Sequence, residues 1–175
     1  MRTLTWTIGA VALAMVQTAQ AQPPSANATA KATANVIQPI TLIKNTDLAF
    51  GALVRPSLGS NTVTVDPSSG ARTLSGSGDA SLSGNQLVSR ATYSVAGEGG
   101  STFSVTIPNS FTLTRAGGGG TVPVSLSASA VPGVLGGSIG SSGSANFSIG
   151  GSLPLSSGTV AGDYTGTFDV TVGYN

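Results

Sequence analysis

The sequence has 175 residues, with seven basic and six acidic side chains and neither histidine nor cysteine. A chain of this length can bury one core without disulfide bonds. Its charge is small and unclustered, which excludes phosphate-backbone tracking, so we expect no nucleic-acid partner.

Residues 1–21 are typical of a secretory signal peptide. Arg2 precedes an apolar run over 6–16, and Ala19-Gln20-Ala21 matches the small-x-small cleavage pattern. The run is shorter than the roughly 20 residues that a membrane span needs, so a retained anchor is the less favoured alternative. We therefore expect a secreted mature chain that begins near Gln22, has no membrane span, and resides in the periplasm or at the surface of a bacterium.

Residues 22–36 are predicted to form an N-terminal extension. After two prolines, alanines alternate with Asn, Thr and Lys. Alanine favours a helix, but Thr and Asn are poor helix formers and no 3.6-residue apolar stripe is present. An extended segment is the better prediction, and it can pair within its own chain or act as a donor strand for a neighbour. Its predicted inward face comprises Ala28, Ala30, Ala32, Ala34 and Val36.

Residues 37–175 alternate between apolar and polar side chains in short runs, which predicts a β-sandwich domain of about nine to ten short strands. No amphipathic helix is indicated, so the expected fold class is all-β and antiparallel. Turns are expected at 44–47, 66–70 and 117–120, and Pro123 should lie at an edge or a bulge because it cannot donate to a ladder. The expected strands cover 40–43, 48–54, 61–65, 91–95, 102–107, 111–114, 121–127, 145–149, 152–155 and 161–175.

The stretch 161–175 has the clearest alternation in the chain and is predicted to form one half-buried strand. Because no hairpin partner follows it, we expect it to pair with the N-terminal segment or with another molecule. Ordinary core packing explains the same pattern at least as well as an assembly role. The side chains expected to face inward are Tyr164, Phe168, Val170, Val172 and Tyr174.

One catalytic motif is matched. The run Gly136-Gly-Ser138-Ile-Gly140 fits G-x-S-x-G, but this nucleophile needs a histidine base, and the chain has none. The six carboxylates are isolated in the sequence, and Asp66 is expected to form a turn. We therefore predict no catalytic, cofactor-binding or metal-binding residues and a protein that is not an enzyme, with an extracellular hydrolase as a remote alternative.

Three segments resemble a bacterial family of secreted proteins, the domain of unknown function 4402 family. They are Leu48-Ala-Phe-Gly51, Gly150-Gly-Ser-Leu153 and the ending 161–175. More distantly, the chain is similar to spore-coat-U and archaic chaperone–usher pilins, whose subunits end in a comparable strand. The pilin resemblance implies an immunoglobulin-like β-sandwich that lacks one strand, which the N-terminal extension of the next subunit supplies. It also implies self-association or a pilus-type chaperone and usher as partners.

These observations favour a non-enzymatic cell-surface or fimbrial subunit, which assembles by strand donation and contributes to adhesion. The alternative is a self-contained monomeric sandwich in the periplasm or at the cell surface that binds a partner through its loops.

Overall fold

A computed structural model describes residues 24–129, 131 and 133–175. The expected signal peptide, residues 1–21, lies outside the described residues. The chain divides into two units, Met1–Asn35 and Val36–Asn175. None of the described residues belongs to a helix that is long and apolar enough to cross a membrane.

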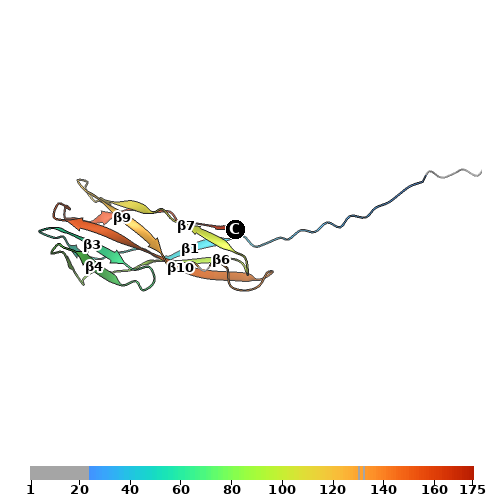
Figure 1. Cartoon of the computed structure of the whole chain (residues 1–175), viewed down its shortest axis with the longest axis horizontal. Coiled ribbons are helices and arrows are strands. Elements are labelled where there is room, and N and C mark those ends of the chain that lie inside the picture. The colour runs from blue at the N-terminus through green and yellow to red at the C-terminus, as the bar shows by residue number, and fades with distance from the viewer. Residues whose placement is uncertain (1–23, 130, 132) are drawn as a thin grey trace, which may run out of the picture. The chain divides into compact units, whose positions relative to one another are not determined.

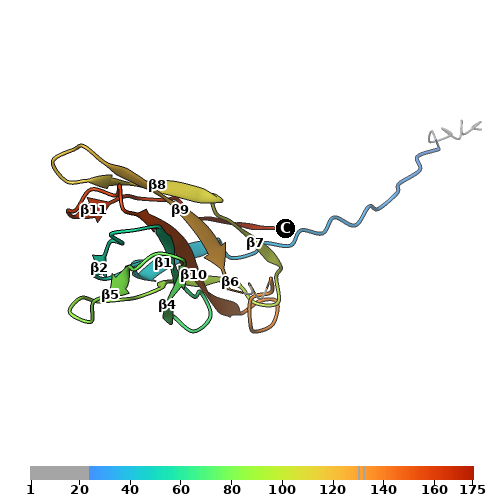
Figure 2. The ribbon, with the colours of Figure 1, turned by 60° about the vertical axis from the view of Figure 1, so that its left-hand side comes forward.

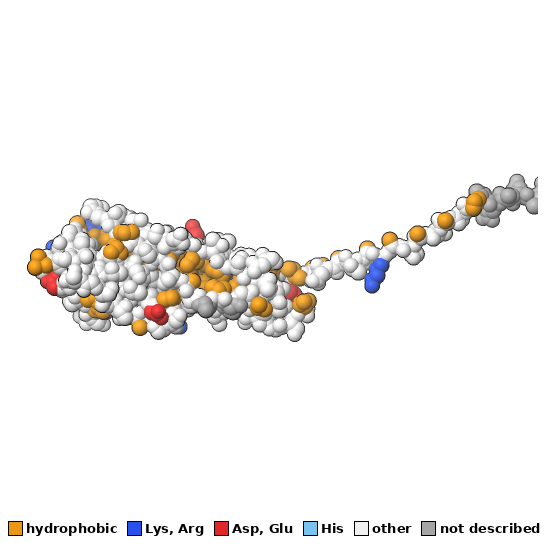
Figure 3. Space-filling model, in the orientation of Figure 1, with side chains coloured by type: hydrophobic (Ala, Val, Ile, Leu, Met, Phe, Trp, Pro, Cys, Tyr) orange, Lys and Arg blue, Asp and Glu red, His pale blue; other side chains and the backbone are white. Residues whose placement is uncertain are grey.

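The described part of the first unit, residues 24–35, forms neither helix nor strand, and its side chains are exposed. Figure 3 shows hydrophobic side chains at intervals along this segment. The sequence predicts an extended conformation here, and no ladder is formed by it within the described residues. Whether it donates a strand to a neighbour stays a prediction.

The described residues of the second unit form strands and no helix, which confirms the predicted all-β fold of antiparallel strands arranged as a β-sandwich. Twelve strands occur within the described residues, slightly more than predicted, because short strands also form in the weakly patterned region after residue 70. The strands are β1 (Thr41–Thr46), β2 (Leu53–Val54), β3 (Ser60–Val65), β4 (Arg72–Gly76), β5 (Ser81–Leu82), β6 (Ala91–Glu98), β7 (Phe103–Thr106), β8 (Ser110–Arg115), β9 (Thr121–Ala128), β10 (Ser142–Ser156), β11 (Tyr164–Thr165) and β12 (Thr171–Tyr174).

The largest sheet has the order β1-β6-β10-β9-β8-β11, and β3 joins it by pairing with both β10 and β4. Two smaller ladders, β12-β7 and β2-β5, complete the fold. Figure 1 shows β7 and β6 toward the C-terminus and β3 and β4 toward the opposite end. Figure 2 shows β8, β9 and β11 along one side of the unit and β2 and β5 along the other.

Strand β10 runs through the whole unit. The sequence predicts two strands, 145–149 and 152–155, but the structure has one continuous strand of 15 residues. Its first part pairs with β6 and its second part with β3, while β9 lies on its other edge. Gly150 permits this change of partner because a Cβ atom there would collide with the carbonyl oxygen of Val65. The pair of glycines therefore marks a close approach of strands and not a loop.

Two hydrophobic cores lie one after the other along β10. In the first core, Tyr93 stacks on Phe147 with the ring centroids 5.2 Å apart. Leu48 and Leu126 contact both cores. The first core consists of Ala91, Tyr93, Val95, Phe103, Leu135, Ala145, Phe147 and Ile149. The second core consists of Phe50, Val63, Val65, Val122, Val124, Leu153 and Leu155.

The C-terminal stretch differs from the prediction of one strand that pairs with the N-terminal segment or with another molecule. It forms two short strands that lie in different ladders, since β11 pairs with β8 and β12 pairs with β7. The expectation that it must pair with the N-terminal segment or another molecule is therefore wrong. The alternation is correct in phase, but alternation carries no information about which strand lies alongside.

The structure differs from two local predictions and agrees with a third. Residues 44–46 belong to β1 and do not form the expected turn. The expected strand 48–54 is interrupted at Gly51, whose positive φ of 70° breaks the extended backbone, so that only residues 53–54 remain a strand. Pro123 pairs with Thr112 of β8, while the ladder between β9 and β10 ends at Ser125, so β9 has a partner on one side only at the proline, as predicted.

The turn at 66–70 is confirmed. The carboxylate of Asp66 accepts hydrogen bonds from the backbone N–H groups of Ser68 (3.0 Å) and Ser69 (2.7 Å). These bonds, chiefly those from Ser69, lower the pKa of Asp66 below its usual value. Asp66 is therefore a turn-forming residue, as the sequence predicts.

Candidate functional site

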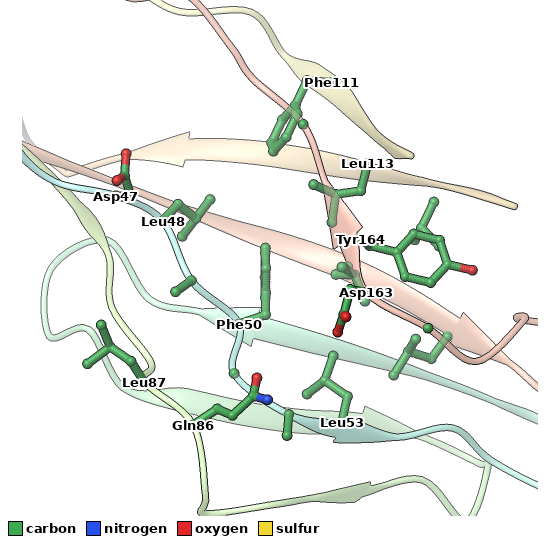
Figure 4. A pocket seen from close by; sticks show the side chains of 18 of the residues that line it. Asp47, Leu48, Phe50, Leu53, Gln86, Leu87, Phe111, Leu113, Asp163 and Tyr164 are labelled. Atoms are coloured by element: carbon green, nitrogen blue, oxygen red, sulfur yellow. The ribbon is translucent and has the colours of Figure 1, made fainter. Parts of the chain in front are cut away.

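The second core is open on one side, where a cavity of about 990 Å³ lies between two walls of chain. One wall is formed by residues from 47 to 55 and the other by residues from 159 to 168. Leu153 and Leu155 of β10 contribute to the lining between them. Figure 4 shows Phe50 and Leu53 on the first wall and Leu113 and Tyr164 on the other side of the cavity. We call this cavity the groove.

Apolar surface makes up more of the groove's lining than polar surface does. Phe50, Leu153 and Leu155 are buried members of the second core that also face the groove, and Phe111 and Leu113 of β8 lie beside them. A polar pair stands at the rim, where the Lys44 ammonium lies 2.5 Å from the Asp47 carboxylate. This hydrogen bond raises the pKa of Lys44. A groove with an apolar lining and a polar rim is suited to an apolar or amphipathic ligand.

The main chain of the first wall is already hydrogen-bonded to its own unit. The Arg72 guanidinium donates to the carbonyl oxygens of Phe50 (2.8 Å) and Ala52 (3.2 Å). Ala49 and Ser89 exchange two backbone hydrogen bonds, of 2.8 and 3.0 Å. This wall therefore offers few free main-chain groups and contributes mainly side-chain surface.

The second wall is held in place by two arginines and a tyrosine. Arg55 donates to the carbonyl oxygens of Ser157 (2.7 Å) and Thr159 (3.0 Å). Arg115 donates to the carbonyl oxygen of Ala161 at 2.8 Å. The Tyr164 hydroxyl donates to the carbonyl oxygen of Val160 at 2.7 Å. The loop before β11 is thus fastened to both sides of the groove.

Beyond β11, the second wall has a stretch of free backbone. No hydrogen bond to the main chain of residues 166–170 is found among the described residues, although ladders flank this stretch at 164–165 and 171–174. Thr167 and Asp169 are exposed, whereas Phe168 and Val170 are half-buried against the first core. Unpaired N–H and C=O groups in a row are a template for another strand. Residues 166–168 of this stretch line the groove, which therefore combines apolar surface with a free main-chain edge.

The opposite end of β10 is closed. There the Glu98 carboxylate, only 2% exposed, accepts hydrogen bonds from the backbone N–H groups of Gln38 (3.1 Å) and Gly140. The Tyr174 hydroxyl accepts from the Glu98 N–H at 2.7 Å and donates to the Gln38 carbonyl at 2.8 Å. Ser142, the first residue of β10, pairs with Glu98. The segment that enters the domain at Gln38 is therefore fixed at the end of β10 that lies away from the groove.

The predicted assembly residues fall in three places. Tyr164 and Phe168 line the groove. Val170, Val172 and Tyr174 pack against the first core and do not reach the groove lining. The third group is exposed in the extended N-terminal segment and comprises Ala28, Ala30, Ala32, Ala34 and Val36.

The sequence did not single out Phe50, Leu53 and Leu113 as site residues. Their alternation marks them as inward-facing, but it does not show that the layer above them is missing. Ser138, from the G-x-S-x-G match, lies in a loop in which its carbonyl accepts a hydrogen bond from the Ser141 hydroxyl at 2.7 Å.

The comparison with family models finds a match over residues 40–174 to DUF4402, a domain of unknown function. The match covers most of the chain, so the protein belongs to this family. No curated protein and no solved structure matches the chain.

Proposed function

We propose that this member of the family is a non-enzymatic, secreted subunit of a cell-surface or fimbrial structure, and that it assembles when its groove receives the N-terminal segment of a second copy. The observation that carries the proposal is the free backbone of residues 166–170 beside an apolar groove of about 990 Å³. An extended segment can satisfy both features at once, because it supplies main-chain partners and alternate side chains.

The N-terminal segment 26–36, which we call the arm, has the chemistry that such a groove accepts. Its even positions carry methyl-sized or apolar side chains and its odd positions carry polar ones. Each hydrogen bond that the arm makes with the free edge stabilises the complex by about 1 kcal/mol. Each buried methyl group contributes about 0.8 kcal/mol more. With such small side chains, we expect main-chain pairing to supply much of the affinity.

The positions of the arm's attachment and of the groove favour a chain of subunits. The arm enters the domain through Gln38, at the end of β10 where Glu98 and Ser142 lie, whereas Leu153 and Leu155 mark the groove toward the other end. A contact between two different surfaces is heterologous, and it produces an open filament unless the rotation between subunits closes a ring. In this proposal, a polymer at the cell surface contributes to adhesion.

The test is the mass of the mature chain, which begins at Gln22, beside that of a chain that begins at Ile37, by light scattering after size exclusion. We expect oligomers from the first and a folded monomer from the second. A labelled peptide spanning Ser25 to Val36 should bind this monomer in fluorescence polarisation. If the longer chain is a stable monomer and the shorter one unfolds, the arm belongs to its own domain and the proposal fails.

Two matched pairs of variants sharpen this test. In the arm, Ala30→Asp places a charge on the inward face and should abolish oligomers, whereas Thr29→Asp places it on the outward face and should not. In the domain, Leu53→Glu in the groove should abolish peptide binding, whereas Thr73→Glu on exposed β4 should leave it unchanged. Equal effects within either pair would argue against strand donation.

A peptide that carries proline at position 30 provides a further control. Proline removes one N–H donor and keeps an apolar side chain, so main-chain pairing should weaken. Unchanged binding of this peptide would indicate that the groove recognises apolar side chains alone.

A further inference from the structure

The exposed large apolar side chains of the second unit are not spread evenly over its surface. Nine of them are exposed in the described residues, and most lie either around the point where the arm is attached or along the groove. Ile43, in β1, belongs to neither group. The group around the attachment of the arm comprises Val36, Ile37, Val134 and Ile139, which we call the root patch. The group along the groove comprises Val54, Leu87 and Val160 of its lining, with Leu58 from the loop that follows Arg55, and we call it the mouth patch.

The root patch is assembled around the buried Glu98 carboxylate. Ile37 precedes Gln38 and Ile139 precedes Gly140, and the N–H groups of Gln38 and Gly140 both donate to that carboxylate. Ile139 is 72% exposed. Nearby, the N–H of Gly100 donates to the carbonyl of Leu135, the neighbour of Val134. The patch therefore lies around the point at which the arm enters the domain.

Three of the four members of the mouth patch line the groove. Val54, Leu87 and Val160 all belong to the groove lining, and Leu87 is 78% exposed. Leu58 lies in the loop that follows Arg55. The Arg55 guanidinium donates hydrogen bonds to the carbonyl oxygens of Ser157 and Thr159, which connects this loop to the second wall of the groove. Small clusters of exposed apolar side chains are common on soluble proteins, but two clusters on one unit can be covered together by a single contact between copies.

We propose that the root patch of one copy seats on the mouth patch of the next, as a second interface in addition to the arm. The occupant of each patch is a second copy of this chain. This inference rests on the proposed function, because an arm that enters the groove at its mouth brings Val36 and Ile37 to the rim residues Val54, Leu87 and Val160. The covalent continuity of the arm with the root patch therefore brings the two patches near one another. Strand donation links the subunits, and the contact between patches restricts how they turn relative to one another.

A double-mutant cycle in the full mature chain tests this contact. Ile139→Ser and Leu87→Ser should each weaken subunit association about tenfold in sedimentation velocity. Because both changes remove the same contact, the double variant should be hardly weaker than either single one. Ile43→Ser is the matched control, an exposed isoleucine outside both patches, and it should have no effect. The proposed contact is wrong if the two losses of association multiply in the double variant, or if neither single variant weakens association.

Cross-linking separates this inference from the proposed function, and the absence of native cysteine makes it simple. A mixture of Ile139→Cys and Leu87→Cys chains, treated with a short bis-maleimide, should give a heterodimer, whereas Ile43→Cys with Leu87→Cys should not. A mixture of Ala30→Cys and Thr167→Cys chains reports strand donation in the same way. If only the Ala30 and Thr167 pair is linked, strand donation stands and the patch contact is wrong. If only the Ile139 and Leu87 pair is linked, the patches meet and strand donation is wrong, and if neither is linked, both proposals fail.

Discussion

The two cores along β10 both consist of aliphatic and aromatic side chains, but they differ in the chain segments that lie over them. Over the first core, β12 pairs with β7, and the Tyr174 hydroxyl ties β12 to Glu98 and Gln38. Over the second core, the chain segments that face each other leave a groove of about 990 Å³. We therefore expect the covered core to contribute more to stability, and our proposal assigns binding to the uncovered core. The predictions below test this division, from the largest expected effect to the smallest.

The first prediction compares one phenylalanine from each core. Phe147 is 2% exposed and stacks on Tyr93, whereas Phe50 is 9% exposed and faces the groove. Phe147→Ala should lower the free energy of unfolding by about 4 kcal/mol, because it leaves a closed cavity. Phe50→Ala should lower it by only about 2 kcal/mol, because one side of the ring already lacks packing partners. Urea denaturation measures both, and equal losses would contradict the division into a closed and an open core.

The second prediction concerns the junction between the cores. A Cβ atom at Gly150 would collide with the Val65 carbonyl oxygen and the Pro67 ring, both of which belong to closely packed chain. Gly150→Ala should therefore cost about 2 kcal/mol of stability by forcing β3 and β10 apart. Gly84→Ala, where nothing lies within 4 Å of the added atom, is the matched control and should cost nothing. Thermal unfolding measures both variants. If Gly150→Ala does not lower the unfolding temperature, the backbone of β10 lies farther from the Val65 carbonyl oxygen than the structure shows.

The third prediction concerns the closed end. Tyr174→Phe removes a hydroxyl that accepts a hydrogen bond from the Glu98 N–H and donates one to the Gln38 carbonyl. The cost should be about 1 kcal/mol, and amide hydrogen exchange should increase at Glu98. Tyr164→Phe at the open end removes only the bond to Val160, which is exposed, and should cost less. The reverse order would show that the groove end is the more tightly held.

The smallest expected effect is a dependence of stability on pH near the mouth patch. The hydrogen bond from the Ser57 hydroxyl, followed by that from the Leu58 N–H, lowers the pKa of Asp79 below its usual value of 3.8. The Asp79 carboxyl therefore binds a proton more readily in the unfolded chain than in the folded one. Ionised Asp79 stabilises the fold above about pH 4, and this contribution is lost as the pH falls through the pKa of Asp79 in the folded state. Asp79→Asn should therefore reduce the difference in unfolding midpoint between neutral pH and about pH 3.

A second variant checks the cause of that dependence. Ser57→Ala removes the largest contribution to the lowered pKa of Asp79 and should reduce the pH dependence in part. A pH profile that neither substitution alters would show that other carboxylates, such as Asp66, determine the acid sensitivity.

Part of the site could be predicted from the sequence. Alternation identified Tyr164 and Phe168 as inward-facing, and both line the groove. It did not distinguish them from Val172 and Tyr174, which continue the same pattern but belong to β12, the strand that covers the first core. Glu98, although charged, is buried by contacts with residues far away in the sequence, and no local pattern indicates this.

The sequence by itself determined the class of this protein. Alternating side chains require strands, turn residues such as Asp66 end them, and the lack of histidine and cysteine removes the imidazole and thiol chemistry of many active sites. Only the tertiary structure decided that β10 is continuous, that the ending 161–175 splits between two ladders, and that one core stays open. The physical reason is that a period of two specifies which side chains are buried, whereas the hydrogen-bonding groups that choose a neighbouring strand belong to the backbone and are nearly the same at every residue.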